Sequence, residues 1–305
     1  EPNTLKFGKN MELNTLIDHY QNGRYMEAEK VALDIFKTSP SNQFTWKILA
    51  ATLLQNGRLS EALEAGKKSV SLAPKDAEAK YNLGVIQHKL GKFGDAINSY
   101  SSAITTDPSH IQSYVNLGIL QKQLDRLEDA ETNFLKAISL KPKDFEVLCN
   151  LGIVQQKIKK LEEAENSYRK SINIKPDYYQ AICNLGTVCQ ELGKLDEAIS
   201  LYEKSLKLNS NNAVIYNNLG NLLVKLDKIS EAKQHYLKAT LLDPNYAEAF
   251  YNLGISNQKL ENYDEAENNY IEAINIKDDY AEAYCNLGVI CQEKKNHTKA
   301  KENIK

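Results

Sequence analysis

The chain of 305 residues has few arginines and no long apolar run, and each shortage excludes a class of protein. Only four of its 38 basic residues are arginine, and the formal net charge is −2. Nucleic-acid binding rests on clustered Lys and Arg that displace counterions, so this balance predicts no nucleic-acid partner. No apolar stretch reaches the roughly 20 residues that span a bilayer, which predicts no membrane insertion.

Cysteine is also scarce. The five cysteines are an odd number, and none is spaced as a CxxC pair or a zinc knuckle: Cys149, Cys183, Cys189, Cys285 and Cys291. Those that share a repeat position would lie on successive stacked helices, beyond the roughly 7 Å Cα separation that a disulfide allows. We therefore expect reduced thiols and a cytoplasmic location. No signal peptide is visible, although a chain that begins at Glu1 rather than Met is compatible with a removed leader.

What the chain does contain is a repeat with a period of 34 residues. The triplet Asn-Leu-Gly first occurs at 82–84 and recurs at this spacing through 286–288 without an insertion. A fixed period of this length indicates stacked supersecondary units. Residues 1–8 are interpreted as a short extended lead-in, and residues 9–305 as eight full repeats and a partial ninth. The repeats begin at Lys9, Gln43, Ala77, Ile111, Phe145, Tyr179, Ala213, Ala247 and Ala281.

Each repeat predicts two helices, called A and B here. Apolar residues at repeat positions 4, 7, 10 and 14 have helical spacing and define helix A. Position 15 is Gly in four repeats, where a left-handed residue ends a helix at little cost. Asp125, Lys159, Asp227, Glu261 and Lys295 hold the same place in the others. Proline at position 32 ends helix B, and its replacement by Ser210 and Asp278 predicts two looser turns.

Small and large residues alternate where the helices must pack. Position 8 is Gly from Gly84 onward, and position 20 is Ala in every repeat. Position 24 is aromatic through the middle of the array, from Tyr100 to Tyr270. Small residues facing large ones give close packing without voids, so we assign these aromatic side chains to the core and not to a stacking platform.

This combination of positions resembles the tetratricopeptide repeat (TPR) over residues 9–305, and the resemblance is closest to the TPR superhelix of O-linked N-acetylglucosamine transferase and related bacterial TPR arrays. Its departures lie mainly at the ends, as with Leu16 at the Gly position of the first repeat. The resemblance implies an all-α solenoid of antiparallel helix pairs in a right-handed superhelix. It also implies that the A helices line a concave groove.

No catalytic constellation is found. The five histidines fall in five different repeat positions, and no P-loop, GxGxxG, HExxH or GxSxG motif is present. We therefore predict no enzyme activity, no cofactor and no metal site within these residues.

The candidate binding residues lie on the A-helix face that the resemblance assigns to the groove. Asparagine recurs at position 6 although it is unfavourable inside a helix: Asn82, Asn116, Asn150, Asn184, Asn218, Asn252 and Asn286. Two explanations stay open. The amides either bridge neighbouring helices, or form a ladder along an extended peptide, as the transferase family implies.

Aliphatic residues follow at position 9, beside a polar rim at position 12. The candidates are Val85, Ile119, Ile153 and Ile255, with Gln156 and Gln190 on the rim. An apolar stripe edged by amides suits an extended segment or an amphipathic helix. The alternative is that adjacent helices half-cover these aliphatic side chains.

Three functions are compatible with this pattern. The first is a non-enzymatic scaffold that binds an extended peptide or helix of a protein partner in the groove. The second is a structural protein that assembles head to tail with itself, since a heterologous contact that does not close gives filaments. The third is a substrate-recruiting arm of a larger enzyme such as a glycosyltransferase.

Overall fold

The computed structural model describes the backbone of residues 2–303 and the side chains of residues 11–295, and all its regular elements are α-helices. The A helices are α1 (Pro2–Gln21), α3 (Gln43–Gln55), α5 (Ala77–Lys89), α7 (Ile111–Gln123), α9 (Phe145–Lys157), α11 (Tyr179–Glu191), α13 (Ala213–Lys225), α15 (Ala247–Lys259) and α17 (Ala281–Asn303). The B helices are α2 (Tyr25–Thr38), α4 (Leu59–Leu72), α6 (Phe93–Thr106), α8 (Leu127–Leu140), α10 (Leu161–Ile174), α12 (Leu195–Leu208), α14 (Ile229–Leu242) and α16 (Tyr263–Ile276).

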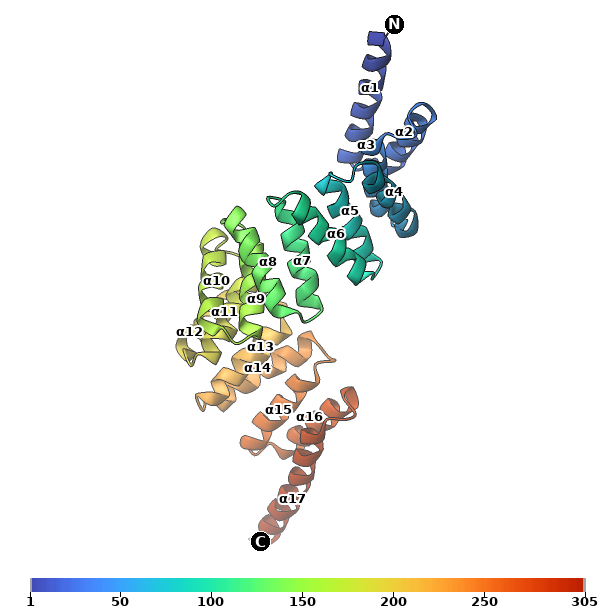
Figure 1. Cartoon of the computed structure of the whole chain (residues 1–305). Helices are drawn as coiled ribbons and strands as arrows, with labels where there is room; N and C mark the ends of the chain where they lie inside the picture. The colour runs from blue at the N-terminus through green and yellow to red at the C-terminus, as the bar shows by residue number, and fades with distance from the viewer. Residues whose placement is uncertain (1, 304–305) are drawn as a thin grey trace. The chain divides into compact units, whose positions relative to one another are not determined.

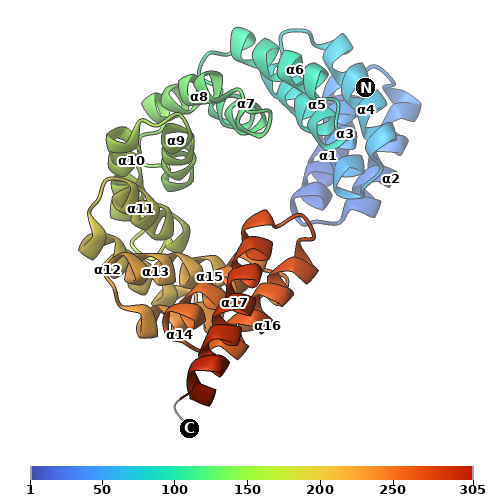
Figure 2. The same cartoon turned by 90° about the horizontal axis from the view of Figure 1, so that it is seen from below.

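The helices form two compact units, residues 1–158 and 159–305. Within each unit a helix packs against the next one along the chain (Figure 1). Successive A helices also contact one another, as α3, α5 and α7 do in the first unit and α11, α13 and α15 in the second. Each unit therefore has a row of A helices beside a row of B helices (Figure 2). This arrangement confirms the predicted all-α solenoid of helix pairs.

The core of a repeat is the contact between a glycine on helix A and an aromatic ring on helix B. A Cβ atom built on Gly84 would lie 2.7 Å from the Tyr100 ring, and one on Gly220 would lie 2.6 Å from the Tyr236 ring. The same contact occurs at Gly118, Gly186 and Gly254. The position-24 rings from Tyr100 to Tyr270 are at most 2% exposed, and the described position-20 alanines are fully buried. The predicted packing is thus confirmed.

The ends of the helices follow the local sequence. Asn42, Asp76, Asp144 and Asn212 cap A helices by accepting a hydrogen bond from the backbone amide three residues on. The B helices instead begin after a basic or Asn residue that makes no side-chain cap. Acidic residues in the first turn of these helices complement the helix dipole and in places pair with that basic residue, as in Arg58–Glu61.

Five repeats lack glycine at position 15, where a left-handed turn is predicted. The structure confirms this turn in four of them and contradicts it in the fifth. Asp125, Lys159, Asp227 and Glu261 have φ between 59° and 63°. Lys295 does not end a helix, because α17 continues through it to Asn303. A left-handed residue other than glycine costs about 1 kcal/mol. In the four repeats that accept this cost an apolar residue precedes the turn, such as Leu124 or Ile158, whereas Lys294 stands there in the ninth repeat.

Two further expectations are corrected by the backbone. The extended lead-in at residues 1–8 is wrong from Pro2 onward, since α1 begins there. Proline is accepted in the first turn of a helix, where its missing N–H leaves no bond unmade. The looser turn is found at Ser210, where the described residues 209–212 form no regular turn. At Asp278 the ordinary turn forms, with Tyr280 N donating to Lys277 O at 3.2 Å.

The glycine–ring contact predicts opposite effects of alanine at two glycines. Gly220→Ala should lower the free energy of unfolding by about 1–3 kcal/mol, because its Cβ overpacks the Tyr236 ring. Gly94→Ala, at an exposed site of α6 where nothing lies within 4 Å, should raise it by up to about 1 kcal/mol. Urea unfolding followed by circular dichroism measures both. Equal effects of the two variants would contradict the overpacking explanation.

The two behaviours of position 15 are also testable. Glu261→Gly should stabilise the chain by about 1 kcal/mol, because glycine adopts its φ of 60° without strain. Lys295→Gly should have the opposite sign, because it places glycine inside a helix. The melting temperatures of the two variants decide the point. A stabilising Lys295→Gly would mean that α17 breaks where the other repeats do.

Candidate binding surface on the A helices

The predicted site residues lie on one face of the A helices, divided between the two units. Val85, Ile119, Ile153 and Ile255 are half-buried, and three of them pack at the edge of a core cluster. The seven asparagines at position 6 are half-buried as well. Neighbouring helices therefore cover part of each aliphatic side chain, and the remainder stays accessible.

Three of the asparagines bridge adjacent A helices. Asn116 Nδ2 donates to the Tyr81 hydroxyl at 3.1 Å, and Asn286 Nδ2 donates to the Tyr251 hydroxyl at 3.2 Å. Asn252 Nδ2 donates to Asn217 Oδ1 at 3.0 Å. Each acceptor lies 35 residues before its donor, at position 5 of the preceding repeat. The bridging explanation therefore holds wherever position 5 offers an oxygen.

The hydrogen bonds of the other asparagines also depend on the residue at position 5 of the preceding repeat. Where position 5 is lysine, valine or cysteine, no equivalent bridge forms among the described residues. Asn150 Oδ1 accepts instead from Lys122 Nζ at 2.5 Å, and Asn218 lies at the Tyr202 hydroxyl. The side chains of Asn82 and Asn184 have no hydrogen-bond partner in the described part of the chain. The identity of the residue 35 positions upstream was thus a usable signal in the sequence.

The polar residues at positions 9 and 12 accept hydrogen bonds from the buried tyrosines. The Tyr236 hydroxyl donates to Asn221 Oδ1 at 2.7 Å, and the Tyr270 hydroxyl to Gln258 Oε1 at 2.8 Å. The Tyr202 hydroxyl donates to Gln190 Oε1 at 3.3 Å. No described residue accepts a hydrogen bond from the Gln190 N–H groups. Some of the predicted rim residues therefore accept hydrogen bonds from buried core tyrosines. The sequence did not predict this role.

The second unit also contains a buried amide network. Asn217, which is 1% exposed, donates to the Tyr246 hydroxyl at 3.2 Å and to Glu248 Oε1 at 3.1 Å. Burial raises the pKa of Tyr246 to about 12, and the nearby Glu248 charge adds to the shift. The phenol is therefore protonated at neutral pH. It acts as a structural hydrogen-bonding group.

A cleft of about 700 Å³ lies apart from the predicted residues, in the first unit between α2 and α4. Its floor is apolar and includes Trp46, whose ring stacks on Phe36 at 4.2 Å between centroids. Its rim includes Glu29, which receives hydrogen bonds from Arg58 at 2.6 and 2.7 Å. The single tryptophan was the only sequence signal for this feature.

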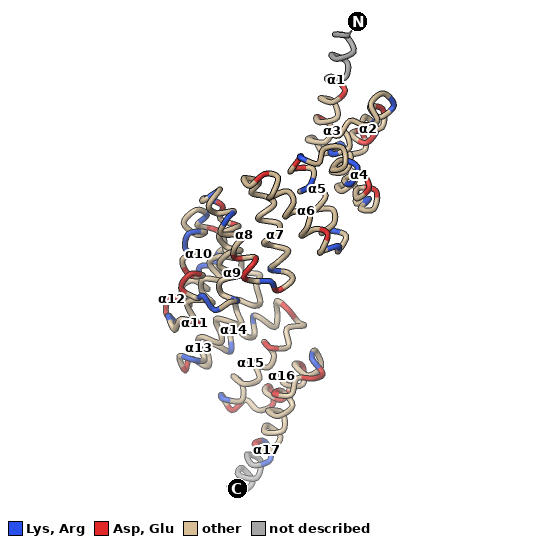
Figure 3. The backbone as a smooth tube through the Cα atoms, viewed as in Figure 1, with Lys and Arg blue, Asp and Glu red and all other residues tan. Residues whose placement is uncertain are grey.

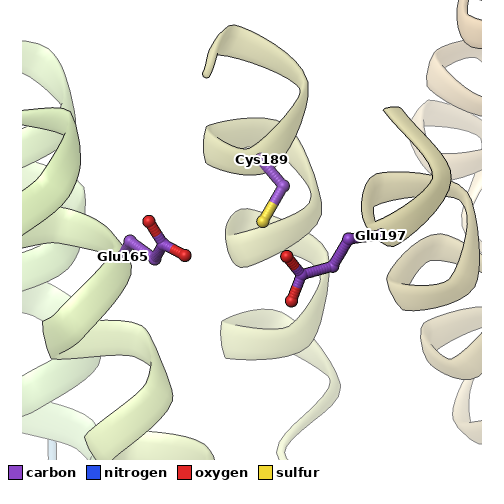
Figure 4. A group of neighbouring side chains, drawn as sticks. All are labelled: Glu165, Cys189 and Glu197. Atoms are coloured by element: carbon purple, nitrogen blue, oxygen red, sulfur yellow. The ribbon is translucent and has the colours of Figure 1, made fainter. Parts of the chain in front are cut away.

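One cluster has the composition of a metal centre. Glu165, Cys189 and Glu197 come from α10, α11 and α12, and their candidate ligand atoms lie within 4.8 Å of one another (Figure 4). Glu165 Oε1 already receives hydrogen bonds from Lys194 and Arg169, each at 2.7 Å. Burial raises the pKa of Cys189 to about 11, so its thiol is protonated at neutral pH. The geometry is therefore that of an ion-pair cluster, in which Lys194 and Arg169 supply the positive charge.

Glu165 should contribute pH-dependent stability. Burial alone would raise its pKa, but hydrogen bonds from Lys194 and Arg169 outweigh that effect and lower it. Its contribution is then complete above the unfolded pKa of about 4.3, and is lost as the pH falls through the lower folded pKa. Glu165→Gln should cost about 1 kcal/mol at pH 7, with solvent screening of Lys194 included. This difference should shrink below about pH 4.

Urea unfolding of both proteins between pH 3 and pH 8 measures this difference. The exposed Glu64, paired with Lys67 within one helix turn, supplies the control variant Glu64→Gln, which should change little at any pH. A cost for Glu165→Gln that does not vary with pH would contradict the ion-pair explanation.

Family models for the tetratricopeptide repeat match the chain over residues 13–77, 77–110, 111–144, 133–166, 188–227, 220–261 and 245–305. Comparison with curated proteins finds no match. None of the described helices has both the length and the apolar character that a membrane crossing requires.

Solved structures share the fold. A chain of the APC/C hetero-tetramer Cut9-Hcn1 is 17% identical with a TM-score of 0.61, over 87% of this chain and 52% of that one, so this chain spans about half of its length. PilF of Pseudomonas aeruginosa is 21% identical with a TM-score of 0.59, over 68% and 94%. YrrB, described as "a TPR protein with an unusual peptide-binding site", is 24% identical with a TM-score of 0.51, over 62% and 97%. The 34-residue helix pairs, the glycine–ring core and these matches together show that the chain belongs to the tetratricopeptide repeat superfamily.

Proposed function

We propose that the chain is a non-enzymatic scaffold whose A-helix row binds an extended peptide of a protein partner. TPR proteins are in general interaction scaffolds, and YrrB is described as having a peptide-binding site. The observation that carries the proposal is the half-exposed aliphatic row, with unused amide groups beside it. In the first unit these are Val85 and Ile119, together with the unpartnered Asn82.

The spacing of the helices favours a particular peptide conformation. Helices that pack side by side have axes about 8–10 Å apart. A polyproline II segment advances about 3.1 Å per residue, so every third residue recurs at about 9 Å. Apolar side chains at i, i+3 and i+6 would therefore meet successive aliphatic residues such as Val85, Ile119 and Ile153. The backbone groups of such a peptide have no internal hydrogen bonds and are free to pair with asparagine and glutamine amides.

In this proposal only some of the position-6 asparagines hydrogen-bond to the peptide backbone. Amides that already donate within the protein, such as those of Asn116 and Asn286, are not available to donate those hydrogens to a peptide. No described residue makes a hydrogen bond to the side-chain amide of Asn82 in the first unit or of Asn184 in the second. The N–H groups of Gln190 likewise have no acceptor among the described residues. Recognition then depends mainly on the aliphatic row, with backbone contacts at a few repeats.

The charge distribution favours a protein partner. Acidic and basic residues are interspersed along both units, and neither sign forms a continuous stripe over the described residues (Figure 3). Head-to-tail assembly and a role as the arm of a larger enzyme stay predictions from the sequence, because no contact of the described residues bears on either.

The proposal is tested by selecting a display library of random 12-residue peptides on the purified chain and titrating the enriched peptides. Selected sequences should repeat apolar residues at every third position. The double variant Asn82→Ala, Val85→Thr should lose about tenfold or more in affinity for peptides that bind the first unit, because it removes the free amide and makes the row polar. Circular dichroism should show unchanged helicity.

The matched control is Leu135→Ser on α8, a side chain 48% exposed on the B-helix row. It should leave peptide affinity unchanged. If peptides lose affinity for Leu135→Ser and keep it for the double variant, the B helices form the binding surface and the proposal is wrong.

A further inference from the structure

The cleft between α2 and α4 lies wholly within the first unit, and every residue that lines it has a described side chain. Its volume of about 700 Å³ lies in the range of roughly 300–1,000 Å³ that is usual for small-molecule pockets. The floor is apolar and comes from three helices: Phe36, Trp46, Leu49, Leu53 and Ala65. The lining residues all fall between positions 29 and 68, so the cleft depends on neither end of the chain.

In the next two repeats a polar pair of side chains joins helix A to helix B. Ser99 Oγ donates to Gln87 Oε1 at 2.6 Å, and Asn133 Nδ2 donates to Gln121 Oε1 at 2.7 Å. Both glutamines hold position 11 and are nearly buried, at 7% and 6% exposed. Their partners hold position 23. The structure thus shows that positions 11 and 23 face each other within a repeat.

The second repeat has no such pair. Leu53 holds position 11 and Ala65 holds position 23, and both line the cleft. The alanine methyl group is shorter than a serine or asparagine side chain, and no hydrogen bond can join it to leucine. No other repeat combines leucine with alanine at these positions. The cleft therefore lies where the polar pair of the following repeats is absent.

Two stacked rings form part of the apolar floor. The centroids of Phe36 and Trp46 are 4.2 Å apart, their planes differ by 28°, and both rings are half-buried. Trp46 Nε1 donates to Pro40 O at 2.9 Å, so the indole N–H is already used. What Trp46 offers to a ligand is therefore ring surface. Aromatic rings favour offset stacking and edge contacts, so a ligand with an aromatic ring suits this floor.

The rim of the cleft leaves one cation without a partner. Each carboxylate on the rim accepts hydrogen bonds from a basic residue: Glu29 and Glu61 from Arg58, and Glu64 from Lys67. Lys68 also lines the cleft, and no described carboxylate pairs with it. An apolar floor beside one uncompensated ammonium group suits a ligand with an apolar body and a single negative charge.

We propose that this cleft binds a small aromatic molecule that carries one carboxylate group. The aromatic ring lies against Trp46 and the two leucines of the floor, and the carboxylate pairs with the Lys68 ammonium group. The site belongs to α2, α3 and α4 and does not use the aliphatic residues of the proposed peptide surface. Either proposal therefore stands without the other.

Trp46 provides the readout, because it is the only tryptophan in the chain. Anilinonaphthalene sulfonate is an aromatic anion that accepts energy from an excited indole, and it should quench Trp46 emission with saturation at one site. Biphenyl carboxylate should displace this probe. Biphenyl carboxamide has the same rings without the charge, and should displace it about two- to fivefold less effectively, which is the size of a solvent-exposed ion pair.

Lys68→Gln tests the charge without disturbing the core. It should weaken the binding of biphenyl carboxylate about two- to fivefold and leave the affinity for the carboxamide unchanged. The matched control is Lys136→Gln, which removes an exposed lysine at the same repeat position of α8, in the repeat where Gln121 and Asn133 form the polar pair. It should bind both compounds like the wild type.

The double variant Leu53→Gln, Ala65→Asn tests the location of the site. It gives the second repeat the same pair of residues that the fourth repeat contains, so the pair should fill the cleft. Affinity for the probe should fall about tenfold or more, because the ligand rings lose their apolar contacts. Circular dichroism should show unchanged helicity. If this variant fails to fold, the comparison of Lys68→Gln with Lys136→Gln still decides the question.

Three results would overturn the proposal. Trp46 emission that does not respond to the probe would leave the cleft to a side chain of a partner protein. Unchanged quenching in the folded double variant would place the probe elsewhere on the chain. Equal affinities of Lys68→Gln and Lys136→Gln for biphenyl carboxylate would mean that the ligand is uncharged.

Discussion

The contact of a helix A glycine with a helix B aromatic ring is the constraint on which the rest of the structure depends. With the ring under 3 Å from where a Cβ would be, the helix axes approach more closely than any other residue at that position allows. The buried alanine at position 20 keeps the same approach on the partner helix. Because the alanine recurs in every repeat and the glycine in every repeat from Gly84 onward, these helix pairs repeat one geometry and the rows of A and B helices follow.

This contact also connects the core to the candidate binding surface. A tyrosine ring that fills the notch carries a hydroxyl group far enough to reach the exposed side of helix A. It donates to Asn221 in one repeat and to Gln258 in another, so the polar groups there are positioned by the core. Side chains on the A-helix face are therefore not independent of the packing beneath them.

The sequence predicts the period, the helix pairs and the buried rings because these depend on spacing within one repeat. Gly84 and Tyr100 are 16 residues apart, and the same pair recurs with the same offset. It predicts less about α1 and α17, because each of these helices packs against described neighbours on one side of the row only. The pattern within a single repeat does not reveal the Asn116–Tyr81 bridge, because its acceptor lies 35 residues upstream, at a position that varies from repeat to repeat.

In a periodic protein, a residue that keeps its place but lacks its usual partner is informative. Asparagine at position 6 bridges helices where position 5 offers an oxygen, and Asn82 retains the amide where that position is lysine. Asn82 keeps the conformational cost of asparagine inside a helix, and no described residue supplies the contact that offsets this cost elsewhere. Hydrogen bonds from another molecule would offset that cost, which is why the proposed peptide surface includes Asn82.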